Sequence, residues 1–144
     1  MYKREVLGLD EARIAVEAII AEASREPDRP VAVAVVDDHG DIICSARMDK
    51  SLPLFSHMAM NKAYTAARMA RDTLTTDNRL RKDGIEIGVW GDNRITTLQG
   101  GVCIVKPYGQ QWPTGTMLGG IGVSGREREE DERLAFVGVK ALNF

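Results

Sequence analysis

Hydrophobic positions near both ends of the chain recur at steps of three and four residues, the spacing of one helix face. The first such stretch runs from Leu9 to Ala23, with Asp10 as the expected N-cap, and Pro27–Pro30 ends it. The second runs from about Glu127 to Leu142. The pattern therefore predicts an amphipathic helix at each end of the chain, each with an apolar stripe that faces a core.

The segment Val31–Val36 alternates valine with alanine, which predicts a buried strand with one bulky face and one small face. A tight turn is expected at Asp38–Asp41, where Gly40 supplies the positive φ angle that such turns need. The segment Ile42–Met48 is then the return strand of an antiparallel hairpin. Because its small side chains leave room, we expect the alanine face to accept a closely packed helix.

Two further strands are expected, at Val102–Val105 and at Thr116–Val123. The second contains Gly119, Gly120 and Gly122, and glycine inside a strand marks a place where another backbone or a ligand approaches closely. Short turns join consecutive strands, so the sheet should be mainly antiparallel. The order of helices and strands indicates the α+β class, folded as a layer sandwich in a single domain over residues 1–144.

Between the two strand pairs, the segment from Ser56 to Arg68 contains neither proline nor glycine and is predicted to be helical. Alanines occupy one of its faces, and a polar stripe occupies another. The stripe consists of His57, Asn61, Tyr64 and Arg68, flanked by Lys62 and Thr65. Such a stripe can line a binding pocket, or it can be the solvated side of an amphipathic helix, and spacing alone leaves both interpretations open. A shorter helix is expected at Thr73–Lys82, followed by a loop that carries Trp90.

Composition narrows the classes of function. The chain has 144 residues with a net charge of −2, so it has no basic footprint for nucleic acid or for an anionic membrane. Cys44 and Cys103 lack partners at metal-ligand spacing, which argues against a zinc site, and we expect no metal. No stretch is typical of a signal peptide or a membrane span, so we expect a soluble, cytoplasmic protein.

Five short motifs, in order along the chain, resemble the HbpS/GlcG-like family. These motifs are Val33–Asp37 leading to Ala46–Asp49, Asn61–Ala66, Gly100–Val102, and Gly120–Gly125 followed by an acidic helix. The resemblance implies a profilin-like α-β-α fold with a central five-stranded sheet, and it implies homo-oligomers. Members of this family bind haem, form an accessory domain of corrinoid adenosyltransferases, or accompany glycolate and aromatic-acid catabolism. The segment Lys106–Thr114 is longer and more aromatic than the short turn expected there.

Several residues are candidates for chemistry, each with a structural alternative. Lys62 can act as a base, pair with a carboxylate, or extend its ammonium to water. Tyr64 can move a proton or stack on a ring, and Arg68 can clamp a carboxylate or pair with an acid of the last helix, such as Asp131 or Glu132. His57 is a candidate haem ligand or base, although a capping or interface role is an equal alternative.

Other candidates come from loops and strand ends. The amides of Gly100 and Gly101 can meet an anion, or the pair can simply start the strand. Trp90 and Trp112 can wall a pocket for a flat ligand or lie in an oligomer interface. Arg47 and Asp49 end a strand and can line the same cavity, and Asn61 on the helix is a further candidate for ligand binding.

Three hypotheses of function remain open. In the first, the protein binds haem or another anionic, carboxylate-bearing small molecule, in a pocket between the Lys62/Tyr64 helix and the Gly100–Gly101 strand edge. In the second, it is a cofactor-independent lyase, isomerase or hydratase acting on an aromatic or hydroxy acid such as a hydroxylaminobenzoate, with Lys62 or Tyr64 as acid or base. In the third, it is a structural or regulatory oligomer subunit. The sequence leaves the cofactor unknown, with haem as a candidate, and leaves open whether the protein is an enzyme.

Overall fold

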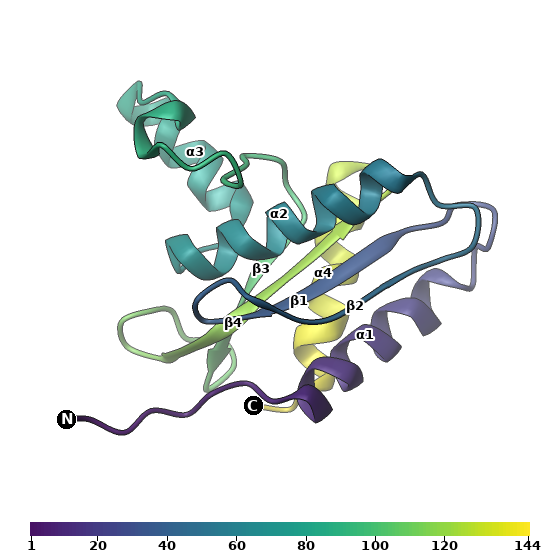
Figure 1. Ribbon diagram of the computed structural model, residues 1–144, viewed down its shortest axis with the longest axis horizontal. Helices are drawn as coiled ribbons and strands as arrows, with labels where there is room; N and C mark the ends of the chain where they lie inside the picture. The colour runs from purple at the N-terminus through teal and green to yellow at the C-terminus, as the bar shows by residue number, and fades with distance from the viewer.

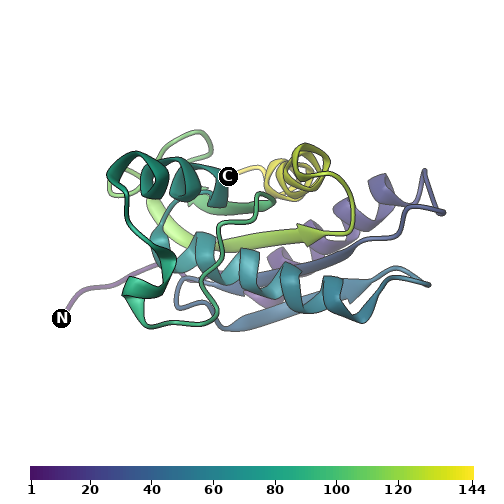
Figure 2. The same cartoon turned by 90° about the horizontal axis from the view of Figure 1, so that it is seen from above.

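The computed structural model describes residues 1–144 and has three layers, with an antiparallel sheet between two helical layers (Figure 1). Seen from above, α2 and α4 lie on opposite sides of the sheet (Figure 2). The elements are α1 (Leu9–Ala23), β1 (Ala32–Asp37), β2 (Ile42–Arg47), α2 (Pro53–Met69), α3 (Thr73–Asp83), the 3₁₀ helix η1 (Ile87–Trp90), β3 (Gly101–Lys106), β4 (Thr116–Ser124) and α4 (Arg128–Ala141). The predicted α+β layer sandwich is confirmed, and none of the helices is both long and apolar enough to cross a bilayer.

The sheet has four strands in the order β2-β1-β4-β3, and each neighbouring pair is antiparallel. The expectation of five strands is therefore wrong. The segment between α3 and β3 forms η1 and turns instead of a strand, because Gly84 and Gly91 adopt left-handed backbone with φ near +63° and +62°. This segment projects away from the sheet together with α3 (Figure 1).

Side chains at the start of α3 occupy the outer edge of β3, where a fifth strand would lie. The amide of Gly101 donates to Thr73 Oγ1 over 3.0 Å, and the amide of Cys103 donates to Asp72 Oδ1 over 2.8 Å. Edge strands expose unpaired backbone groups that must be covered or paired. Here two side chains pair with two of these amides, and they fix the start of α3 against the sheet.

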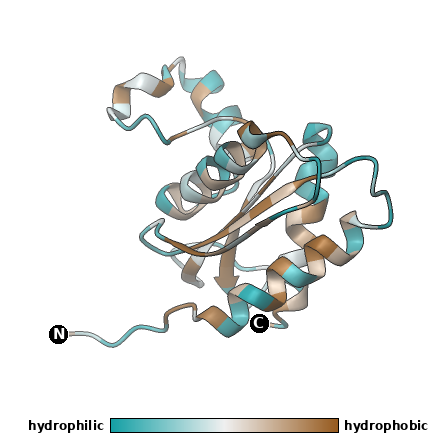
Figure 3. Cartoon of the chain, turned by 45° about the vertical axis from the view of Figure 1, so that its right-hand side comes forward, coloured by the Kyte–Doolittle hydropathy of each residue, from teal (hydrophilic) through white to brown (hydrophobic).

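One face of the sheet packs on α1 and α4 and forms the larger core. Val33 and Val35 of β1, and Val31 just before it, belong to this core, as their alternation predicted. Ile19 of α1 and Leu134 of α4 are fully buried against them. The strands accordingly form a hydrophobic band, with the polar positions of the helices turned outward (Figure 3).

The other face is the small one, and α2 lies directly on it. Ala32 and Ala34 of β1 pack against Ala59, Ala63 and Ala67 of α2. The prediction of a closely packed helix over the alanine face is therefore confirmed. Burial of these small side chains brings the helix backbone unusually near to the strands, which sets the position of every polar group that α2 carries.

The glycines of β4 make this close approach possible. A β-carbon added to Gly122 would lie 2.0 Å from the carbonyl oxygen of Ala59, and one on Gly120 would lie 2.4 Å from that of Ala63. Such distances are far inside van der Waals contact. The glycines thus mark the approach of another backbone, which is one of the two predicted alternatives.

The N-cap of α1 lies two residues earlier than expected. Gly8, not Asp10, is the N-cap, and its amide donates to Glu11 Oε2 over 3.2 Å. Glu11 therefore takes the role of the capping acceptor. The predicted homo-oligomer stays a prediction, since the structure describes one chain.

Adding a methyl group at Gly122 should break the contact between α2 and the sheet. We expect Gly122→Ala to lower the free energy of unfolding by about 3 kcal/mol, because overpacking of a closed contact forces the backbone apart. Gly88→Ala is the matched control, since nothing lies within 4 Å of a β-carbon there. Urea unfolding of both variants measures the effect, and equal stabilities would contradict the close-contact account.

Candidate functional site

Lys62 lies inside the protein and forms an ion pair with α4. Its Nζ donates to Asp131 Oδ2 over 3.0 Å and to the carbonyl oxygen of Val123 over 2.8 Å, and its side chain is 3% exposed. Asp131 also accepts the amide of Arg126 over 2.9 Å. Burial lowers the pKa of Lys62 and raises that of Asp131, and each charge opposes the shift in the other. Of the alternatives for Lys62, the structure shows the carboxylate pair.

The predicted opening between α2 and the double glycine is closed. A β-carbon on Gly101 would lie 2.3 Å from the carbonyl oxygen of Lys62, so the two backbones touch. At Gly100, a β-carbon would lie 3.0 Å from both Lys62 Nζ and Asp131 Cβ. The expected pocket at this place is therefore wrong, because the helix itself fills it. Anion binding by the two glycine amides stays a prediction without a cavity to support it.

The Tyr64 side chain of α2 is held by the loop that follows η1. Its hydroxyl donates to Asp92 Oδ2 and accepts from Arg94 Nη2 over 2.7 Å, and the Arg94 guanidinium lies 3.9 Å from the ring centroid. Burial raises the pKa of Tyr64, and the hydrogen bond to Asp92 adds to the rise. Gly40 of the hairpin turn packs on the same ring. The acid or base role of Tyr64, like that of Lys62, stays a prediction.

The other members of the predicted polar stripe are less buried than Lys62 and Tyr64. Arg68 is exposed, and its Nη1 donates to the carbonyl oxygen of His39 over 3.4 Å. The suggested pair of Arg68 with Asp131 is wrong, because Lys62 takes that carboxylate. His57 is exposed and lies 3.1 Å, nitrogen to nitrogen, from Asn61 Nδ2. Arg47 lines a separate hollow of about 340 Å³ between β2 and α2.

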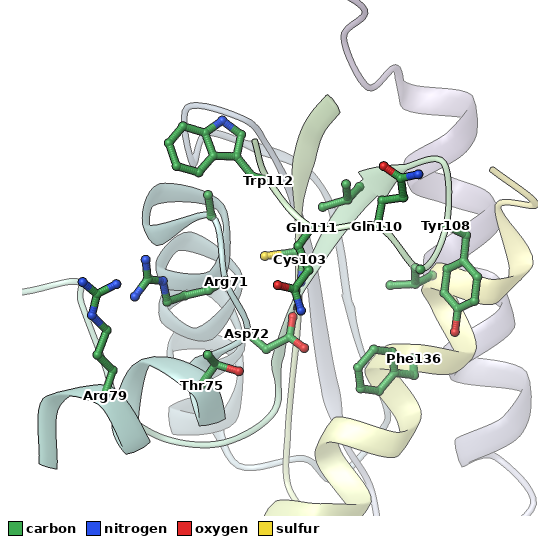
Figure 4. A pocket seen from close by; sticks show the side chains of 14 residues that line it. Arg71, Asp72, Thr75, Arg79, Cys103, Tyr108, Gln110, Gln111, Trp112 and Phe136 are labelled. Atoms are coloured by element: carbon green, nitrogen blue, oxygen red, sulfur yellow. Dashed lines mark hydrogen bonds between the residues drawn. The ribbon is translucent and has the colours of Figure 1, made fainter. Parts of the chain in front are cut away.

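A hollow lies beyond the C-terminal end of α2, and we call it the main hollow. Its volume is about 510 Å³. Arg71 and Arg79 stand at one side, Tyr108 and Phe136 stand at the other, and Trp112 lies at the rim (Figure 4). It therefore combines two cations with three aromatic rings, which is the composition predicted for a pocket that takes a flat anion.

Asp72 and Cys103 lie between these walls, in the middle of the main hollow (Figure 4). Burial raises the pKa of the Asp72 carboxyl, and the amide of Cys103 partly offsets the rise. Burial also raises the pKa of the Cys103 thiol, and the nearby Asp72 charge adds to this. The thiol is therefore neutral, and its sulfur donates to the carbonyl oxygen of Ala66 over 3.3 Å.

The structure thus divides the predicted site residues among several places. Trp112 lines the main hollow, whereas Trp90 lines a smaller neighbour of about 260 Å³. Arg71, Asp72 and Arg79 were missed by the sequence analysis. The main hollow is made by three segments that are far apart in the sequence, so no single motif reveals it. The one local signal was the aromatic segment after β3.

A protein-family model described as haem degrading protein HbpS-like matches residues 7–140, nearly all of the chain. The chain belongs to this family. A crystal structure of a Streptomyces reticuli HbpS double mutant has a TM-score of 0.84 to this fold, at 26% identity, over 100% of this chain and 92% of that one. A crystal structure of a PduOC:heme complex has a TM-score of 0.80, at 26% identity, over 96% of each chain.

Curated relatives of the family extend the comparison. Protein GlcG of Escherichia coli is 32% identical over 110 residues, which cover 74% of this chain and 75% of GlcG. The corrinoid adenosyltransferase PduO of Salmonella typhimurium is 29% identical over 126 residues, which cover 85% of this chain but 35% of PduO. The HbpS-like chain therefore spans about a third of the adenosyltransferase.

Removing the Lys62 ammonium should destabilise the protein. We expect Lys62→Met to cost about 4 kcal/mol, because it leaves the Asp131 carboxylate buried without its partner. Adding Asp131→Asn should recover part of the loss, since no unpaired charge then remains. Lys140→Met, at an exposed position of α4, is the control. Urea unfolding compares the three variants with the wild type, and wild-type stability of Lys62→Met would contradict a structural role and favour the acid–base prediction.

The raised pKa of Asp72 predicts a pH-dependent stability difference. The folded protein holds this proton more tightly than the unfolded chain, so the contribution of Asp72 falls as the pH rises above about 4. Asp72→Asn keeps an acceptor for the Cys103 amide but carries no charge. We expect the variant to be more stable than the wild type at pH 7, by a margin that shrinks as the pH falls toward 4. Urea midpoints measured across this range test the sign, and a constant margin would disprove it.

Proposed function

We propose that this HbpS-like protein binds haem, or another flat molecule that bears carboxylates, in the main hollow. The observation that carries the proposal is the pairing of Arg71 and Arg79 with the rings of Tyr108 and Trp112 around one cavity. A volume of about 510 Å³ lies in the range of small-molecule sites, about 300–1,000 Å³. The site differs from the one expected from the sequence, whereas the class of ligand is the same.

Each wall of the hollow suits one part of such a ligand. Guanidinium groups bind carboxylates through paired, charge-assisted hydrogen bonds, so Arg71 and Arg79 would hold the propionates of haem. Aromatic side chains pack on a porphyrin face and remove it from water. Arg71 is well placed for this role because it is half-buried and forms no salt bridge within the chain.

The residues around the hollow fit a porphyrin better than they fit its iron. No histidine lines the cavity, and its one sulfur donor, Cys103, is a neutral thiol with a raised pKa. A thiol must lose its proton before it can ligate iron. We therefore expect binding through the carboxylates and the ring. The role of His57 as an axial ligand stays a prediction, at an exposed position of α2 outside this cavity.

The relatives support haem as the ligand to test first. PduOC has been crystallised in a complex with heme, and its chain matches this one along almost the full length. The description of the family names haem degradation. Neither statement identifies the residues that bind haem in this chain, so the assignment to the main hollow depends on its own geometry.

Haemin titration of the purified protein tests the proposal. We expect a saturable shift of the Soret band and quenching of Trp112 fluorescence. Arg71→Ala and Arg79→Ala should each weaken binding about tenfold or more, because each removes a hydrogen bond to a charged group. His57→Ala should leave the spectrum unchanged.

The matched control is Arg13→Ala, since Arg13 is exposed on α1 and lies 3.9 Å from its nearest acidic partner, Glu17. Its affinity should equal that of the wild type. Wild-type affinity in both Arg71→Ala and Arg79→Ala would exclude the main hollow as the binding site. Loss of binding in His57→Ala alone would move the site to the exposed face of α2.

A further inference from the structure

A second hollow lies behind the two arginines of the main hollow, and we call it the small hollow. It encloses about 260 Å³ between the end of α2, the side of α3 and η1. Its apolar lining comes from Met69, Leu80, Ile85 and Trp90, and its polar lining comes from Arg71, Thr76, Arg79 and Asp83. Arg71 and Arg79 therefore line both hollows. The small hollow has room for one ring rather than for a porphyrin.

The buried hydroxyl of Thr76 distinguishes the small hollow from an ordinary surface depression. Thr76 is 1% exposed, and its Oγ1 is the one buried side-chain nitrogen or oxygen in the chain that lacks a hydrogen-bond partner. Nearby buried threonines are paired: Thr65 Oγ1 accepts the amide of Thr96 over 2.9 Å, and Thr73 Oγ1 accepts the amide of Gly101. A buried hydroxyl without a partner is unfavourable, so native structures rarely keep one without a use.

The hydroxyl can reach the cavity by a single rotation. Threonine in a helix populates two χ1 rotamers, and a change of about 120° between them carries Oγ1 to a staggered position that Cγ2 or Hβ held before. Since Thr76 already lines the small hollow, such a rotation would turn the hydroxyl toward a molecule inside it. The backbone would not have to move, because the Thr76 amide keeps its bond to the carbonyl oxygen of Asp72.

We propose that the small hollow binds a small carboxylate with a flat apolar body, of the size of a monocyclic aromatic acid. Trp90 would pack on the ring, Arg71 or Arg79 would hold the carboxylate, and the Thr76 hydroxyl would donate to one of its oxygens. The proposal is independent of haem binding in the main hollow. It assigns a use to the unpartnered hydroxyl and to Trp90, neither of which the main hollow employs.

Arg71 and Arg79 line both hollows, so the charge of a ligand in one hollow affects binding in the other. A guanidinium that holds a carboxylate in the small hollow is less available to an anion in the main hollow. Two anionic ligands would therefore weaken each other, and the coupling would be equal in both directions. The small hollow would then act as a sensor of small acids that tunes occupancy of the larger one.

The two tryptophans of the chain allow each hollow to be observed separately, since Trp112 lines the main hollow and Trp90 lines the small one. Trp112→Phe leaves Trp90 as the sole indole, and benzoate is the probe. We expect benzoate to change Trp90 fluorescence saturably in this variant. Benzamide, which has the same shape without the charge, should bind at least tenfold more weakly, as expected for loss of a charge-assisted bond.

Thr76→Val, made in the Trp112→Phe background, is the decisive variant, because it keeps the shape of the side chain and removes only the hydroxyl. We expect it to raise the melting temperature of the free protein and to weaken benzoate about tenfold. Thr116→Val, at an exposed position of β4, is the matched control and should change neither quantity.

Three results would overturn the proposal: no response of Trp90 to benzoate, equal affinity for benzamide, or wild-type affinity for benzoate in Thr76→Val. A melting temperature that falls in Thr76→Val would also do so, since the hydroxyl would then be satisfied without a ligand. A failure of haemin to bind would leave these readouts intact, so the two proposals fail separately.

Discussion

The contact between the backbone of α2 and the glycines of the sheet determines where everything else can lie. Gly120 and Gly122 bring the helix so near to β4 that no side chain can separate them. Lys62 is consequently buried, and the carboxylate of Asp131 on α4 balances the charge of its ammonium group. The strand glycines thus let the helix fill the space where a cavity was expected. The same contact places Lys62 in the protein interior.

That same contact explains why the layers could be predicted and the site could not. The alternation of valine and alanine in β1, and the alanines of α2, identify both faces of the sheet from local spacing alone. The fold class, the hairpin and the helix over the small face are confirmed for this reason. The polar stripe of α2 was predicted to line the binding site. Spacing along a helix, however, does not determine whether such a stripe faces solvent, a partner or a cavity.

The errors have physical causes that act over long sequence distances. A fifth strand is replaced by Asp72 and Thr73, whose side chains bond to the outer amides of β3. The main hollow forms where the end of α2 and α3, the outer edge of β3 with the segment after it, and α4 meet. In the sequence, only the aromatic segment after β3 indicated a pocket here. Arg71 and Arg79 could not be recognised as lining residues, because the residues opposite them are distant in the chain.

Pairing, more than burial or residue type, separates the structural cations of this protein from those available to a ligand. Lys62 is nearly inaccessible, and its ammonium already has a carboxylate and a carbonyl oxygen as partners. A ligand would have to compete with both, at the cost of stranding Asp131. Arg71 is half-exposed, forms no salt bridge and faces two hollows, so an incoming carboxylate gains its full interaction and breaks nothing. The same argument applies among neutral groups, where Thr76 is the hydroxyl without a partner and lies beside the same arginines. The unpaired Arg71 and Thr76 thus lie together where α2 ends and α3 begins, and there a ligand can bind without breaking an existing contact.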